Sequence, residues 1–131
     1  MAPPKIFTLE EATSLMSQVR EYVQQIQAHK HRADESREAY EQLDAAHARG
    51  NGYDMQREIL ANQIIDSMKS VQAGFLKLRD IGCELKDIEM GLIDFPSIRN
   101  GQLINLCWMI DEDEIGFWHS LDSGFASRKP F

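Results

Sequence analysis

The residues best suited to chemistry lie in the last third of the chain. They combine a carboxylate, an indole, an imidazole and a guanidinium: Asp94, Trp118, His119 and Arg128. A guanidinium binds carboxylate and phosphate groups in a bidentate manner, so Arg128 is suited to anchoring an anion. The simpler interpretation is a salt bridge between Arg128 and Asp94 that holds the C-terminal tail in place. We therefore regard these four residues as candidate binding residues and assign no catalytic residue.

The two cysteines raise the questions of zinc binding and of nucleophilic catalysis. Cys83, Cys107 and His119 lack the Cys-x-x-Cys or His-x-x-x-His spacing that brings zinc ligands together. Free cysteines are among the most buried side chains, so the sequence predicts ordinary core thiols and neither a metal site nor a cofactor. A nucleophilic Cys107 would need a base within hydrogen-bond reach. The strand pairing predicted below separates Cys107 from His119, which disfavours that role.

Two short charged runs could also attract metal ions. The run Asp111-Glu112-Asp113-Glu114 lacks the twelve-residue spacing and the central glycine of an EF-hand loop. The run His29-Lys30-His31-Arg32 lies in a predicted helix, where residues one and two apart do not face each other. Both runs are therefore predicted to be solvated surface.

A β-hairpin must position the candidate residues. Asn100-Gly101 lies between two apolar runs and predicts a type I′ turn. A two-residue loop pairs Asp94 with Cys107 and Ile93 with Trp108, and it places Pro96 at a non-hydrogen-bonded position where its missing amide is tolerated. Side chains alternate between the two faces of a sheet. One face is predicted to be the core: Ile93, Phe95, Ile104, Leu106, Trp108 and Ile110. The other is predicted to be open: Asp94, Asn105 and Cys107.

The positions of Trp118 and His119 depend on the less regular turn at Asp111-Glu112-Asp113-Glu114. If Ile110 faces Ile115, Trp108 faces Phe117, and Trp118 lies beside Cys107 on the open face. A shift of one residue would exchange Trp118 and His119 between the faces.

Two long helices precede the sheet. Thr8-Leu9-Glu10-Glu11 matches a capping box, so a helix is predicted to begin at about Leu9. Gly50-Asn51-Gly52 is predicted to end it, and the second helix is predicted to end near Ile81-Gly82. A short loop between long helices makes an antiparallel hairpin. Each helix carries one seam of apolar residues at heptad spacing. The seam of the first helix consists of Leu9, Ala12, Met16, Val19, Val23 and Ile26. The seam of the second consists of Leu60, Ile64, Met68, Val71, Phe75 and Leu78.

Composition narrows the classes of function. The chain has 131 residues, 43% of them hydrophobic, which suits one globular domain. A formal net charge of -7 argues against general binding to nucleic acid or to anionic membranes. No segment resembles a signal peptide or a membrane span, so we expect a cytoplasmic protein with reduced cysteines.

Several motifs together resemble a known family. They occur at both ends of the chain and in the predicted sheet: Phe7-Thr8-Leu9-Glu10-Glu11-Ala12, Gly91-Leu92-Ile93-Asp94-Phe95-Pro96, Leu106-Cys107-Trp108, Trp118-His119 and Gly124-Phe125-Ala126-Ser127-Arg128-Lys129-Pro130. The chain is similar to the small bacterial family catalogued as domain of unknown function 2203. It differs in the turn, where Asp111 and Asp113 replace an expected glycine and proline. The resemblance supports the architecture and implies no particular activity.

The sequence thus predicts an α+β fold in a single domain, residues 1–131. Residues 8–82 are expected to form a long, coiled-coil-like helical hairpin, and residues 83–131 a β-meander and tail. The expected function is a non-enzymatic interaction module that dimerises through the helices, because the distal Tyr40, Leu43, Ile59 and Leu60 cannot be buried within one small domain. The alternative is a small enzyme or anion-binding protein that uses the open sheet face.

Overall fold

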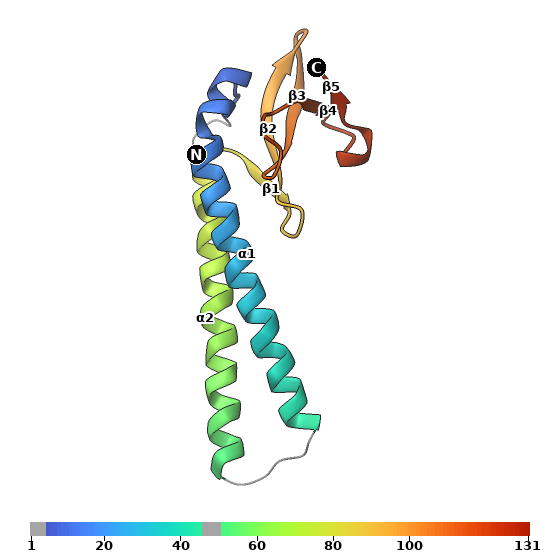
Figure 1. Cartoon of the computed structure of the whole chain (residues 1–131). Helices are drawn as coiled ribbons and strands as arrows, with labels where there is room; N and C mark the ends of the chain where they lie inside the picture. The colour runs from blue at the N-terminus through green and yellow to red at the C-terminus, as the bar shows by residue number, and fades with distance from the viewer. Residues whose placement is uncertain (1–4, 46–50) are drawn as a thin grey trace.

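The computed structural model describes residues 5–45 and 51–131, and it shows a helical hairpin with a sheet at one end (Figure 1). The helices are α1, Leu9–Ala45, and α2, Asn51–Ile81. The strands are β1, Glu84–Asp87; β2, Leu92–Arg99; β3, Gln102–Met109; β4, Phe117–Ser120; and β5, Lys129–Pro130. A short 3₁₀ helix, η1, Phe125–Ser127, precedes β5. The predicted α+β fold is confirmed.

The start of α1 forms as the capping box predicts. The Glu11 amide donates to Thr8 Oγ1 at 3.1 Å, and the Thr8 amide donates to Glu11 Oε1 at 3.0 Å. The preceding residues join the sheet, because the Phe7 amide donates to the Pro96 carbonyl at 2.7 Å and Ser97 Oγ donates to the Phe7 carbonyl at 2.6 Å. The N-terminal lead-in is thus attached to β2.

The two helices lie side by side near the sheet and diverge toward their connection (Figure 1). Close contact is possible there because Gly74 of α2 has no side chain; a Cβ at this position would lie 2.9 Å from Cδ1 of Ile26. The predicted α1 seam is buried except at its first residue, Leu9, which is 41% exposed; the buried residues are Ala12, Met16, Val19, Val23 and Ile26. Gly82 has a φ of 108°, a conformation that suits glycine, and it ends α2 as predicted.

The predicted connection between the helices needs correction. Asn51 and Gly52 belong to α2 rather than to a loop, and α1 ends at Ala45. Gly50, the remaining residue of the predicted loop, lies outside the described residues. Helix α2 therefore begins within the segment that was predicted to be the loop.

The sheet is antiparallel, with strand order β1-β2-β3-β4-β5. The pairing of β2 with β3 is confirmed: Asp94 pairs with Cys107 and Pro96 with Asn105. Asn100 and Gly101 have φ angles of 51° and 77°, as a type I′ turn requires. The segment after α2 forms β1, at the start of the region predicted to be a β-meander.

The predicted pairing of β3 with β4 is wrong by one residue. Leu106 pairs with Trp118, and Asn105 pairs with His119. The reason lies in the turn, where the Glu112 amide donates to the Met109 carbonyl at 2.9 Å and the Met109 amide donates to Glu112 Oε1 at 2.9 Å. Because Glu112 folds back over the end of β3, strand pairing resumes only at Cys107 and Phe117. His119 and Trp118 therefore exchange faces relative to the prediction.

The C-terminal tail adds a last strand to the sheet. It contains η1 and β5, and β5 pairs with β4 through Phe117 with Pro130 and Trp118 with Lys129. Over the described residues, neither helix has an apolar stretch of the length needed to cross a bilayer.

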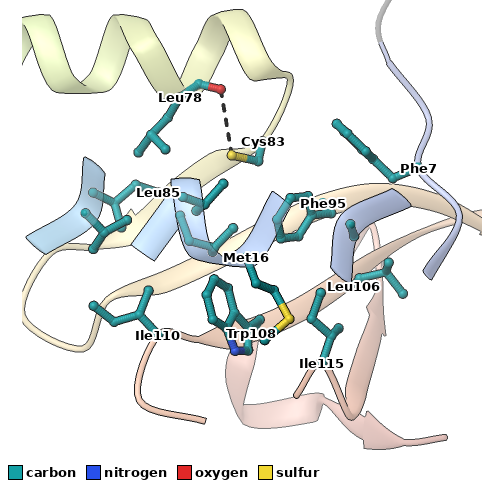
Figure 2. Packing of buried hydrophobic residues seen from close by; sticks show 14 of the residues in the cluster. Phe7, Met16, Leu78, Cys83, Leu85, Phe95, Leu106, Trp108, Ile110 and Ile115 are labelled. Atoms are coloured by element: carbon teal, nitrogen blue, oxygen red, sulfur yellow. Dashed lines mark hydrogen bonds between the residues drawn. The ribbon is translucent and has the colours of Figure 1, made fainter. Parts of the chain in front are cut away.

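The core lies between the sheet and the nearer half of the hairpin (Figure 2). Trp108 is fully buried within it, and its Nε1 donates to the Glu112 carbonyl at 3.0 Å. Arg20 of α1 covers the indole ring at 5.2 Å from its centroid, and Arg20 Nε donates to the Ile110 carbonyl at 2.9 Å. Arg20 therefore links helix α1 to the Trp108 side chain and to the backbone just after β3.

Candidate functional site

Three neighbouring strands bring Asp94, Cys107 and His119 together. Asp94 of β2 lies directly opposite Cys107 of β3, and His119 of β4 projects from the same face because it pairs with Asn105. One carboxylate oxygen of Asp94, Cys107 Sγ and one ring nitrogen of His119 all lie within 4.8 Å of one another. Among the side chains that the structure describes, this is the one set of three potential metal ligands. We call it the Asp-Cys-His cluster.

The cluster is buried, so the expectation of an open sheet face is wrong at its centre. The exposed fractions are 3% for Asp94, 0% for Cys107 and 4% for His119. Arg128 reaches this face from the tail, where it hydrogen-bonds with Cys107 and is itself largely covered. Asp94 is consequently part of a buried polar network.

Both nitrogens of His119 are held. Nε2 lies 3.0 Å from Asp94 Oδ1, and Nδ1 lies 2.9 Å from the Ser120 carbonyl oxygen. A carbonyl can only accept, so Nδ1 carries a proton and donates it to Ser120. Nε2 is thereby directed toward Asp94 and Cys107.

Burial disfavours the charged forms of both acidic groups. It raises the pKa of Asp94, against the opposing effect of the His119 hydrogen bond. Burial also raises the pKa of the Cys107 thiol to about 11, the Asp94 charge adds to this effect, and Arg128 opposes it. Cys107 is therefore a protonated thiol at neutral pH.

The cluster does not have the geometry of a nucleophilic triad. In such a triad the histidine contacts the nucleophile with one nitrogen and the orienting carboxylate with the other. Here Nε2 faces the carboxylate, while Nδ1 is bound to a backbone carbonyl. With a buried thiol of raised pKa, Cys107 is poorly placed for nucleophilic attack.

Arg128 forms a salt bridge, but with Glu112 rather than with Asp94 as predicted. Arg128 Nη1 and Nη2 donate to Glu112 Oε1 and Oε2 at 3.1 and 2.9 Å. Burial would raise the pKa of Glu112, but the bonds from Arg128 and from the Met109 amide outweigh it and lower that pKa. The guanidinium also lies 3.9 Å from the centroid of the Phe117 ring. Both terminal nitrogens of the guanidinium are thus bonded to Glu112, which leaves Arg128 poorly suited to anchoring an anion.

Trp118 lies apart from the other predicted site residues. It projects to the core face beside Leu106 and packs against the core. Arg99 and Lys129 approach its ring, at 5.0 and 5.2 Å from the centroid. Its buried Nε1 has no hydrogen-bond partner among the described residues, and nothing in the structure explains this.

The two charged runs behave as surface, apart from Glu112. Asp111, Asp113 and Glu114 are exposed. In the run on α1, Lys30 pairs with Asp34 and His31 pairs with Glu35, each one helical turn away. Sequence reasoning missed Glu112, because nothing in an acidic turn marks which carboxylate folds inward.

A family model matches residues 5–131, nearly the whole chain. The family is described as an uncharacterized conserved protein, DUF2203. The chain belongs to this family. The resemblance inferred from the motifs of DUF2203 is therefore confirmed, and the family description assigns no activity. The chain matches no curated protein and no solved structure.

Proposed function

We propose that this DUF2203 protein is a non-enzymatic interaction module that forms a homodimer through α2. The observation that supports this most directly is an apolar stripe along α2, exposed where the helices diverge. Ile65 and Met68 have exposed fractions of 50% and 38%. Large contiguous apolar surface on a soluble protein indicates an interaction site.

The stripe is hollowed into a shallow groove. Its volume is about 620 Å³, and its lining is almost entirely apolar: Ile64, Ile65, Met68, Lys69, Val71, Gln72 and Phe75. All of these residues belong to α2. A helix of a partner protein is the element that fits such a groove.

The spacing of the stripe favours a second copy of α2 as that partner helix. The stripe is symmetric about Met68, with residues at three, four and seven positions on either side: Ala61, Ile64, Ile65, Val71, Gln72 and Phe75. A two-fold axis through Met68 would make two antiparallel α2 helices contact each other through equivalent positions. Such an isologous interface is the commonest way in which soluble proteins self-associate.

The other candidate function, an enzyme or anion-binding protein at the sheet, has weaker support. Asp94 and His119 meet in a buried cluster, whereas Arg128 is paired with Glu112 and Trp118 lies on the other face.

The free, buried cysteines suit a reducing compartment, and we place the module in the cytoplasm.

Met68→Glu tests the homodimer. It places two like charges at the proposed axis, so we expect a dimer for the wild type and a monomer for the variant by light scattering at high micromolar concentration. Met90→Glu is the matched control, because Met90 is also 38% exposed but lies in the turn after β1. The control should remain dimeric.

A covalent test complements this one. Met68→Cys should give a disulfide-linked dimer under mild oxidation, because the two thiols would meet at the axis. A monomeric wild type, or equal dimerisation of Met68→Glu and the wild type, would overturn the proposal.

A further inference from the structure

We propose that the Asp-Cys-His cluster is a binding site for a divalent transition-metal ion of the zinc class. The ligands would be Asp94 Oδ1, Cys107 Sγ and His119 Nε2. The proposal is independent of dimerisation, since the cluster lies in the sheet and the proposed interface lies on α2.

The spacing of the three atoms is close to what a tetrahedral centre needs. Zinc bonds of 2.0 to 2.3 Å imply ligand atoms separated by about 3.3 to 3.8 Å. The three atoms lie within 4.8 Å of one another, and Nε2 and Oδ1 are 3.0 Å apart. Small side-chain rotations therefore suffice to close the site around an ion.

The orientation of His119 is that of a metal ligand. Histidines that bind metals donate their other ring N–H to a carbonyl or carboxylate, which fixes the tautomer. The Ser120 carbonyl does this for Nδ1 at 2.9 Å. The lone pair of Nε2 in the neutral ring then points into the cluster, where an ion would replace the proton shared with Asp94.

The ligand types select the class of ion. A thiolate, an imidazole and a carboxylate are together a borderline-soft set that suits Zn²⁺ and does not suit Ca²⁺ or Mg²⁺. On binding, the ion displaces the proton of the Cys107 thiol to solvent, and the resulting thiolate and the carboxylate together neutralise a divalent charge. Three protein ligands leave a fourth position for water or another small ligand.

The surroundings provide an outer shell. The Arg128 guanidinium interacts with Cys107 and is itself oriented by the bidentate bond to Glu112. A cation in this place stabilises a thiolate, and outer partners of this kind influence metal affinity. Asp94 also lines a groove of about 840 Å³ between β1, β2 and the end of α2, so this groove reaches one of the three ligands.

The alternative interpretation is a structural polar pair beside a core thiol. It explains the Asp94–His119 bond and treats the position of Cys107 beside that bond as core packing. The two interpretations predict different numbers of bound metal ions per chain, and only the metal site predicts a bond between the ion and the Cys107 sulfur. Both properties can be measured.

The full-length, metal-stripped protein titrated with Zn²⁺ or Co²⁺ tests the proposal. We expect one ion per chain, a thiolate-to-cobalt charge-transfer absorption, and a higher melting temperature with Zn²⁺. The absorption band on the wild type requires no variant, so the test remains decisive even if a substitution prevents folding. No bound ion, or a cobalt spectrum without a thiolate band, would overturn the site.

Matched variants assign the ligands. Cys107→Ala should remove the charge-transfer band and weaken binding by at least about 100-fold, since it deletes a ligand. Cys83→Ala is the control, because Cys83 is also buried but bonds the Leu78 carbonyl within the core (Figure 2). His31→Gln controls for the exposed His31–Glu35 pair on α1. Both controls should bind as the wild type does. Unchanged binding by Cys107→Ala, or loss of binding by His31→Gln, would identify adventitious surface binding and overturn the proposal.

Discussion

The two halves of the helical hairpin differ in what covers them. Near the sheet, Val19, Val23 and Ile26 of α1 are completely buried, and Trp108 closes the core from the sheet side. Beyond Ala33, none of the described side chains of α1 is buried, and none of those on α2 before Val71 is buried. The same helices therefore have a core at one end and none at the other.

The sheet, rather than helix propensity, accounts for this difference in burial. Two helices alone cover only one seam of each other, whereas a sheet packed across both covers a wider face. In the distal half the helices diverge, so even the seam is thinly covered (Figure 1). Stability should consequently be concentrated at the sheet end, and the distal half should be free for interaction.

The largest expected effect is that of Trp108→Ala. This change removes a fully buried indole, its bond to the Glu112 carbonyl and its contact with Arg20. The free energy of unfolding should fall by about 3 to 5 kcal/mol in a urea melt. A loss below about 1 kcal/mol would show that the sheet end is not the stable half.

A smaller effect is expected from Glu112→Gln at neutral pH, which breaks the bidentate bond to Arg128. We expect a loss of about 1.5 to 3 kcal/mol, since both side chains are largely buried and the bond is charge-assisted.

The same salt bridge should make stability depend on pH. The folded protein has a lowered pKa for Glu112, so its contribution is present above the unfolded pKa of about 4.3 and is lost as pH falls through the folded pKa. The wild type and Glu112→Gln should therefore differ in urea melts at pH 7 and converge in acid. An equal difference between them at both pH values would contradict the assigned salt bridge.

The smallest effect is expected from Ile59→Ala in the distal half. Ile59 is 52% exposed and lies off the stripe centred on Met68. Its truncation should change the free energy of unfolding by no more than about 0.5 kcal/mol. A loss comparable to that of Trp108→Ala would mean that the distal half has a core of its own.

Features of the fold that depend on neighbouring residues were predictable from the sequence. The Thr8–Glu11 capping box and the Asn100-Gly101 turn each form as expected. A two-residue turn fixes the register of everything beyond it, which is why Asp94 opposite Cys107 was predicted correctly. The seam of α1 followed from heptad spacing for the same local reason.

Other features were decided only by the tertiary structure. The pairing of β3 with β4 depends on Glu112, whose carboxylate bonds Arg128 sixteen residues later and whose carbonyl bonds the Trp108 indole. No local rule relates such distant residues, and the resulting shift of one residue moves His119 to the face of Asp94 and Cys107. The Asp-Cys-His cluster has no sequence motif because each strand contributes one ligand and hydrogen bonds across the sheet, rather than spacing along the chain, bring the three together.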